Sequence, residues 1–166
     1  TCRRARGSPV GCGPPRREGF SAARPRVVYE DDSELPSHLE GWRTALATNH
    51  LYYVDPEPEE LNAVQRTWLV QHVNTFERAL FGADFRDPAR GYAAYIDPGS
   101  FIDYHLIVEV SKNVDGFRFS TFYFKDRGGR IHMGPIWDWN LSFGNCNAKQ
   151  GWIPEYWLWP QLDDRE

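Results

Sequence analysis

Apolar residues recur at spacings of three and four between residues 57 and 82, which predicts an amphipathic helix. Asp55 and Pro56 are typical of a helix start, and Gly82 is typical of a helix end. The apolar positions of this helix are Leu61, Val64, Trp68, Leu69, Val73, Phe76 and Leu80. Such a stripe serves either to bind a partner or to face the core, and we interpret it as the core-facing side.

A second helix is predicted over residues 101–112. Ser100 and Asp103 resemble a capping box, with Asp in place of the usual Glu. Its expected buried face consists of Phe101, Tyr104, Ile107 and Val108. Residues 27–57 mix short apolar pieces with Asp, Glu and Pro, so we predict irregular structure there, with a possible short helix at 41–46.

The period then changes from that of a helix to that of a strand. Residues 117–125 alternate and are rich in aromatics, residues 126–129 are turn formers, and residues 130–137 read as the returning strand. Pro135 disturbs this second strand and is expected at an edge or a bulge. The pattern predicts an α+β fold with helices packed on a small antiparallel β-hairpin sheet.

Charge divides the chain into two parts. Residues 1–26 contain seven Arg and one Glu, a net charge of +6, so the remainder carries −10 of the total of −4. Residues 1–26 form an N-terminal arm that is rich in Gly, Pro and Arg, and we expect this arm to be disordered and dispensable. Residues 27–166 are expected to form one domain. An acidic body is a poor nucleic-acid binder, and no apolar run approaches the length of a membrane span.

Two carboxylates flank the predicted hairpin. Asp115 precedes it and Asp138 follows it, so pairing of the strands about 4.8 Å apart is expected to bring the two carboxylates together. Neighbouring carboxylates repel, so such a pair tends either to share a proton or to hold a cation, such as magnesium or calcium. Amide oxygens for such an ion are nearby in sequence on Asn113, Asn140, Asn145 and Asn147. The alternative is a pair of solvated loop carboxylates.

Several stretches carry a resemblance to a known family. They are Phe101-Ile-Asp-Tyr-His-Leu, Asn113-Val-Asp-Gly, Ser120-Thr-Phe-Tyr-Phe-Lys-Asp-Arg-Gly-Gly, Gly134-Pro-Ile-Trp-Asp-Trp-Asn and Phe143-Gly-Asn. They resemble the CotH kinase family, which includes spore-coat protein H kinases and many bacterial surface or secreted proteins. The resemblance implies a fold similar to the larger lobe of a kinase, and an atypical protein kinase that uses ATP and Mg²⁺ to phosphorylate Ser or Thr of a protein. Ca²⁺ and Mn²⁺ are the alternative cations for such oxygen ligands.

The resemblance also assigns roles to single residues. Asp115 matches the catalytic-loop acid and Asp138 the metal-binding acid, with Asn140 as a second metal ligand. Many family members have Asp at the position of Asn140 and Asn at the position of Ser120, so both positions depart from the family pattern.

A kinase also needs a Lys that grips the nucleotide phosphates. The first Lys in this sequence is Lys112, and no glycine-rich phosphate loop is present. We therefore expect the chain to be the C-terminal, metal-binding part of a CotH-type kinase and to be inactive alone.

Five of the seven tryptophans crowd the C-terminal third of the chain: Trp137, Trp139, Trp152, Trp157 and Trp159. Tryptophans of this density either stack on sugar rings or pack a core and its rim, and we favour packing. Two other functions therefore stay open beside the kinase. One is a catalytically silent CotH-like surface or spore-coat module with a structural cation. The other is a carbohydrate-associated binding module.

Overall fold

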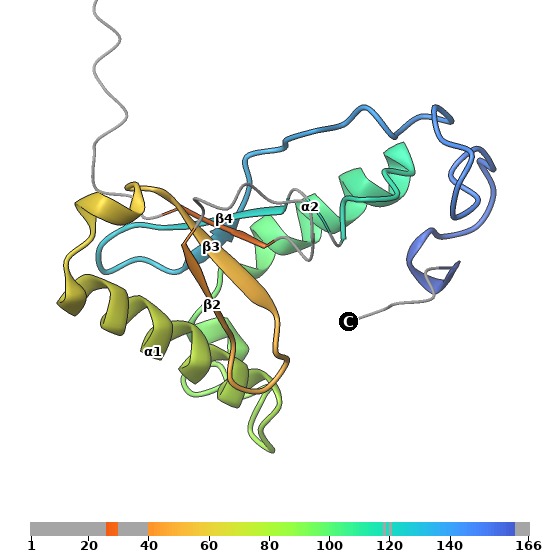
Figure 1. The fold of residues 1–166 in the computed structure, drawn as a ribbon. Coiled ribbons are helices and arrows are strands. Elements are labelled where there is room, and N and C mark those ends of the chain that lie inside the picture. Colours follow the sequence, from red (N-terminus) through yellow and green to blue (C-terminus); the bar gives the residue numbers. More distant parts are fainter. Residues whose placement is uncertain (1–25, 30–39, 118, 120, 162–166) are drawn as a thin grey trace, which may run out of the picture.

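A five-stranded antiparallel sheet forms the centre of the fold (Figure 1). The computed structural model describes residues 26–29, 40–117, 119 and 121–161. The strands lie in the order β2-β3-β1-β4-β5, so the first strand in sequence is the middle strand in space. Their bounds are β1 Arg26–Tyr29, β2 Gly41–Arg43, β3 His50–Asp55, β4 Thr121–Lys125 and β5 Ile131–Met133. With two helices beside the sheet, the predicted α+β class is confirmed.

The prediction of irregular structure over residues 27–57 was wrong. Three strands lie in this stretch, and β3 is hidden from a period-2 pattern because Leu51, Tyr52 and Tyr53 are all buried. A strand with neighbours on both sides, here β2 and β1, reads as a continuous apolar run rather than an alternation. The short helix expected at 41–46 is replaced by β2. A Cβ at Gly41 would lie 2.2 Å from the Leu51 carbonyl oxygen, so this close pairing requires glycine.

The predicted hairpin at residues 117–137 is confirmed, but both strands are shorter than expected. Strand β4 begins at Thr121 and β5 ends at Met133. The turn between them closes with the Gly129 N–H donating to the Asp126 carbonyl at 3.0 Å. Gly134 and Pro135 lie beyond β5, where Pro has no N–H to offer a ladder. The returning strand therefore stops before residues 134–137.

Helix α1 spans Ala63–Leu80 and begins later than the sequence predicts. Its cap is Asn62, which forms a reciprocal capping box with Gln65, whereas residues 58–60 form a separate 3₁₀ turn. Leu69 is buried as expected. Val64 and Trp68 are 78% and 50% exposed, so the expected core stripe was wrong at these positions. The buried face lies further around the helix and includes Glu77, whose side chain binds the β2–β3 loop.

Helix α2 spans Pro98–Ser111. Its cap is Asp97, which accepts the Ser100 N–H at 2.8 Å, and Pro98 occupies the first turn. The predicted capping box of Ser100 and Asp103 was therefore wrong by one turn. The expected buried positions Tyr104 and Val108 are confirmed.

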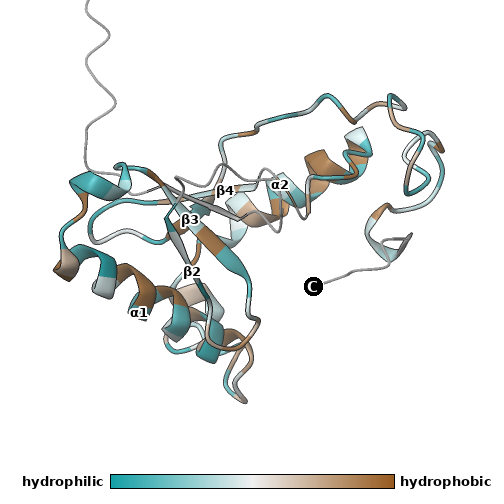
Figure 2. Cartoon of the chain, viewed as in Figure 1, coloured by the Kyte–Doolittle hydropathy of each residue, from teal (hydrophilic) through white to brown (hydrophobic). Residues whose placement is uncertain are grey.

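Two apolar clusters share the interior. Residues of β3 and α1 form the first, around Leu51, Tyr53 and Leu69. The second contains Tyr104 and Val108 of α2 together with Val114 and Leu158 from segments that follow it. Figure 2 shows apolar residues over most of the C-terminal half of α2, where the second cluster lies. That cluster positions the candidate site described next.

Candidate functional site

Asp115 lies in the turn that follows α2 and is half-buried. The helix ends where Lys112 adopts a left-handed backbone conformation with φ 54°. Asn113, only 1% exposed, then accepts the Asp115 N–H on its Oδ1 at 3.2 Å, which forms an Asx turn. The Asp115 carbonyl in turn accepts the Phe119 N–H at 2.8 Å. The backbone of Asp115 is thus held on both sides.

Gly116 lets this turn pack directly on α2. A Cβ at residue 116 would lie 2.7 Å and 2.9 Å from the two Val108 methyl groups, closer than real side chains approach. The Gly116 N–H also donates to the Asn113 carbonyl at 3.1 Å. The sequence Asn-Val-Asp-Gly therefore folds into a loop whose shape depends on the amide of Asn113 and on the missing side chain of Gly116.

Asp138 lies on the segment that follows β5 and is exposed to solvent. Its φ of 54° places it in the left-handed region, which Asp visits more readily than most residues. The neighbouring Trp139 is half-buried, and its indole N–H donates to the Ser111 hydroxyl at 2.9 Å. The Trp139 ring also meets the Tyr104 ring edge-on, with centroids 6.1 Å apart. Trp139 thus anchors the Asp138 segment to α2.

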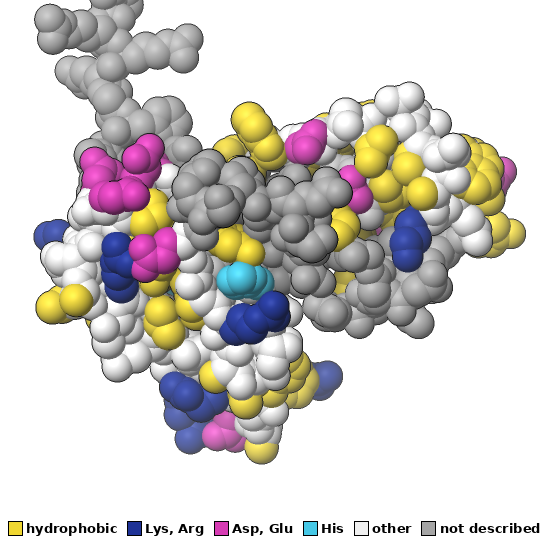
Figure 3. All heavy atoms as spheres, viewed as in Figure 1, with side chains coloured by type: hydrophobic (Ala, Val, Ile, Leu, Met, Phe, Trp, Pro, Cys, Tyr) yellow, Lys and Arg dark blue, Asp and Glu magenta, His cyan; other side chains and the backbone are white. Residues whose placement is uncertain are grey.

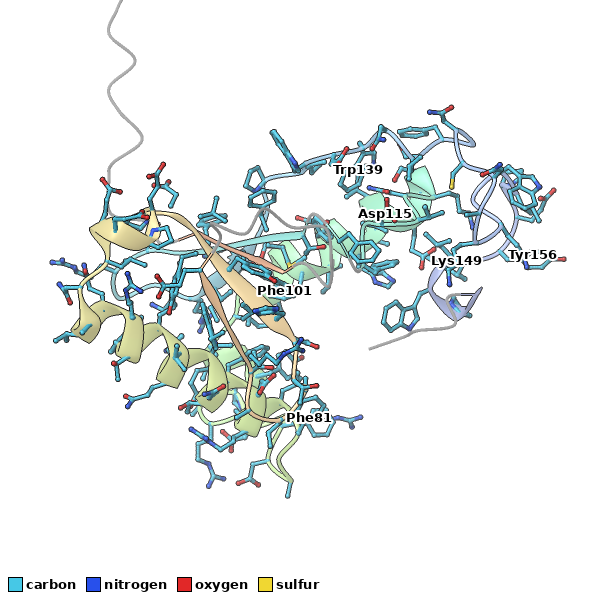
Figure 4. All side chains as sticks on the ribbon, viewed as in Figure 1. Phe81, Phe101, Asp115, Trp139, Lys149 and Tyr156 are labelled. Atoms are coloured by element: carbon cyan, nitrogen blue, oxygen red, sulfur yellow. The ribbon has the colours of Figure 1, made fainter. Side chains whose placement is uncertain are left out.

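The segments that carry Asp115 and Asp138 meet at the C-terminal end of α2. The Val114 N–H donates to the Leu141 carbonyl at 3.4 Å, and the Phe143 N–H donates to the Ser111 carbonyl. Figure 4 shows Asp115 and Trp139 beside each other at this end of the helix. Strand β4 begins only at residue 121 and β5 ends at residue 133, so strand pairing does not extend to Asp115 or Asp138. Contacts with α2 bring the two segments together instead.

The oxygen atoms near this meeting point suit a hard cation such as Mg²⁺ that is bound jointly by the protein and by the phosphates of a substrate. Within the described ranges, no three or more His, Cys, Asp or Glu side chains cluster as a metal cage. The predicted set instead offers the carboxylates of Asp115 and Asp138 and the amide oxygen of Asn140. Mg²⁺ is commonly bound by one or two carboxylates together with substrate phosphates. The donors present fit that mode of binding better than an all-protein site.

The nearby Asn side chains differ in their hydrogen bonds within the protein. The Asn113 side-chain oxygen accepts the Asp115 N–H, so Asn113 shapes the loop. The Asn145 side-chain amide donates to the Asn140 carbonyl at 2.8 Å and closes the turn after Asp138. Asn140 and Asn147 are exposed. Of the four amides proposed from the sequence, Asn113 and Asn145 have structural contacts.

Sequence reasoning missed a cluster of Trp68, His72 and the buried Lys125 between α1 and the sheet. The Lys125 ammonium lies 5.0 Å from the centre of the Trp68 ring, although Lys125 is only 5% exposed. The His72 ring stacks on Trp68 with centroids 4.9 Å apart. Burial lowers the pKa of Lys125, and burial followed by the nearby Lys125 charge lowers the pKa of His72. Residues 68, 72 and 125 show no local pattern that signals this contact.

Two Lys residues, Lys112 after α2 and Lys125 at the end of β4, have contacts that hold them in the fold. The Lys112 ammonium donates to the carbonyls of Glu155 and Tyr156, and that of Lys125 donates to the Asp126 carbonyl at 3.1 Å. These contacts turn both ammonium groups toward the protein backbone. Neither Lys112 nor Lys125 is therefore placed as a grip for nucleotide phosphates.

Comparison with known protein families identifies a relationship for most of the chain. The family model described as CotH kinase protein matches residues 40–163, a span that contains Asp115, Asp138 and Asn140. No curated protein and no solved structure matches the chain. In the described part of the chain, no helix has the length and apolar character needed to cross a membrane.

Proposed function

The chain belongs to the CotH kinase protein family, and on that premise we propose that it provides the metal-binding and catalytic-loop part of a Mg²⁺-dependent protein kinase. The proposed reaction transfers the γ-phosphoryl group of ATP to a Ser or Thr hydroxyl of a protein. The observation that carries the proposal is the convergence of the Asp115 and Asp138 segments on the C-terminal end of α2, through Val114, Trp139 and Phe143.

Each carboxylate has a distinct role in this proposal. Asp115, held by the Asx turn, accepts the proton of the substrate hydroxyl as that oxygen bonds to phosphorus and the γ-phosphorus bond to the ADP oxygen breaks. Asp138, exposed on a segment that Trp139 anchors to α2, would supply the charged oxygen for Mg²⁺, and Asn140 would supply a neutral one. A bound Mg²⁺ would neutralise the charge that develops on the phosphate oxygens.

Metal binding in the presence of nucleotide tests the proposal most directly. Free and bound Mn²⁺ can be separated by electron paramagnetic resonance of the 166-residue chain, with and without ATP. We expect Asp138→Asn to weaken Mn²⁺ binding by at least about tenfold, because it removes the charged ligand. Asp84→Asn, at an exposed acid in the loop that follows α1, is the matched control. Equal affinities for the Asp138 variant and the unaltered chain would overturn the proposal.

Transfer of label from γ-labelled ATP to a Ser-rich peptide tests catalysis. We expect little transfer from this chain alone, because phosphoryl transfer depends on positioning and neither Lys112 nor Lys125 reaches out to a phosphate. Label transfer that disappears in both Asp115→Asn and Asp138→Asn would establish the two roles and contradict the expected inactivity. Mn²⁺ binding by Asp138 that ATP does not strengthen would instead favour a silent module with a structural cation.

A further inference from the structure

Ser111 is the last residue of helix α2, and it is fully buried. Its hydroxyl oxygen accepts the indole N–H of Trp139 at 2.9 Å, and its O–H donates to the Val108 carbonyl at 3.2 Å. A hydroxyl has one donor and two acceptor positions, so the bond to the helix carbonyl leaves the lone pairs for Trp139. The helix thus orients the acceptor that Trp139 uses.

The backbone of Ser111 holds a second point of the segment that follows β5. The Ser111 carbonyl accepts the Phe143 N–H, farther along this segment than Trp139. Between these two points, the Ser142 hydroxyl donates to the Trp139 carbonyl at 2.6 Å and closes a turn. One residue of α2 therefore contacts both ends of the turn, and Asp138 directly precedes it in the chain.

The conformation of Asp138 needs support from its neighbours. Asp138 is exposed, and its φ of 54° lies in a region that residues other than glycine rarely occupy. Such a conformation persists where the surrounding structure enforces it. The adjacent residue supplies two such contacts, the bond from the Trp139 indole to Ser111 and the packing of its ring against Tyr104. Without the bond to Ser111, the backbone at Asp138 could relax and move the carboxylate.

Ser111 lies at the same end of α2 as the loop that carries Asp115. The Val114 N–H of that loop donates to the Leu141 carbonyl, so the loop also contacts the turn that Ser111 holds. Figure 3 shows acidic side chains on the surface of the right-hand half of the molecule, where Figure 4 labels Asp115 and Trp139. Both candidate carboxylates are therefore positioned relative to one helix end.

We propose that Ser111 is a positioning residue for metal binding, which acts on Asp138 through the indole of Trp139. The inference rests on the proposed function, because it takes Asp138 as the charged ligand of the ion. Ser111 is itself buried and its hydroxyl is engaged with Val108 and Trp139, so its effect on the metal is indirect. Partners that orient metal ligands in this way typically change metal affinity by about 10–100-fold.

Mn²⁺ binding in the presence of ATP, measured by electron paramagnetic resonance, tests the proposal. Ser111→Ala removes the acceptor, whereas Trp139→Phe removes the donor and keeps a ring beside Tyr104. Each is expected to weaken Mn²⁺ binding by about tenfold. The double variant is expected to bind no more weakly than either single variant, because both remove the same hydrogen bond. In an Asp138→Asn background, Ser111→Ala should have no further effect, since the positioned carboxylate is gone.

Glu77→Ala is the control for a general loss of stability. It removes buried hydrogen bonds between α1 and the β2–β3 loop and is expected to leave Mn²⁺ affinity unchanged. Amide hydrogen exchange adds a measurement that needs no metal. The backbone N–H groups of residues 138–143 are expected to exchange at least about tenfold faster in Ser111→Ala than in Glu77→Ala, because the turn loses its contact with α2. Trp139→Phe repeats both measurements if Ser111→Ala does not fold.

Three results would overturn the inference and leave the proposed function intact. They are unchanged Mn²⁺ affinity in both single variants, an equal loss of affinity in Glu77→Ala, and fully additive losses in the double variant. Unchanged exchange of residues 138–143 in both single variants would also overturn it. Absence of Mn²⁺ binding by the unaltered chain would overturn the proposed function, and the inference with it.

Discussion

At the residue scale, the shape of the loop that carries Asp115 depends on two neighbours that have no role in the proposed reaction. Asn113 is fully enclosed, and its side chain replaces a backbone turn contact for Asp115. Gly116 sits against the methyl groups of Val108. The candidate catalytic acid is thus positioned by a buried amide and by the absence of a side chain.

Gly116→Ala tests how tightly this loop is packed. The added methyl group would overlap Val108, whose short side chain has little room to move, so we expect a loss of about 1–3 kcal/mol of unfolding free energy. The melting temperature should fall by about 2–4 °C for each kcal/mol. Gly129→Ala is the control, because its nearest neighbour is the Asp126 carbonyl oxygen at 3.4 Å. Equal melting temperatures for both variants would show that the loop yields easily.

His72 makes a second residue-scale prediction, which concerns pH. Its Nε2 is buried without a hydrogen-bond partner, and burial together with Lys125 lowers its pKa below the ordinary 6.5. As the pH falls, His72 is therefore protonated in the unfolded chain at a higher pH than in the folded protein. Stability is expected to be complete above about pH 6.5 and to decline as the pH falls through that value toward the lower pKa of the folded state.

Melting temperatures measured from pH 7.5 to pH 5 would show this decline. His72→Phe keeps a ring to stack on Trp68 but cannot be protonated, so its melting temperature is expected to fall less over the same range. The two proteins should melt at similar temperatures at pH 7.5. An identical pH profile for the variant would assign the acid sensitivity to other groups.

At the element scale, helix α1 is joined to the sheet by a buried carboxylate as well as by apolar packing. Glu77 is 5% exposed, and its two oxygens accept the N–H groups of Leu46 at 2.9 Å and Ala47 at 3.4 Å. Asn74, one turn earlier on α1, accepts the Ala45 N–H at 3.0 Å. The loop between β2 and β3 is thereby tied to one face of α1.

Glu77→Ala would remove the acceptor for two loop N–H groups. Leaving such groups unpaired costs about 1–3 kcal/mol, so we expect urea unfolding to shift to lower concentration by a corresponding amount. Glu77→Gln retains one carbonyl oxygen and should lose less. Gln71→Ala, at an exposed position of the same helix, is the control. A Glu77→Ala protein as stable as the control would mean that water replaces the carboxylate without cost.

At the scale of the whole molecule, the first strand in sequence joins the two halves of the sheet. Residues 26–29 pair with β3 on one side and with β4 on the other. Arg26 is opposite Asp55 and Phe124, so the strand includes the last residue of the predicted 1–26 arm, and residues 1–25 lie outside the described residues. The strand joins the β2–β3 pair to the β4–β5 hairpin.

Two truncations separate the arm from the strand. Deleting residues 1–25 is expected to leave the melting temperature unchanged within about 2 °C, because that stretch has little apolar material to bury. Deleting residues 1–29 removes the middle strand and is expected to abolish cooperative unfolding, since β3 and β4 lose their shared neighbour. A drop of several degrees in the shorter truncation would show that the arm packs on the domain.

The sequence by itself determined both helices, the β4–β5 hairpin and the α+β class. Helix spacing, alternation and turn residues act over a few neighbouring positions, so their pattern survives in the chain without its fold. Asp115 and Asp138 were also identified from the chain, through their places beside the hairpin and their resemblance to family motifs. Their assigned chemistry stays a prediction that the Mn²⁺ and label-transfer experiments address.

Only the tertiary structure decided which side chains and segments meet. The place of β1 between β3 and β4, the anchoring of Trp139 on Ser111 and the contact of Lys125 with Trp68 each join residues far apart in sequence. Such contacts depend on which faces become buried, and burial is a property of the assembled fold. The position of Trp152 and Trp157 follows the same rule, because Glu109 and Lys112 fasten their segment to α2 and both rings stay exposed.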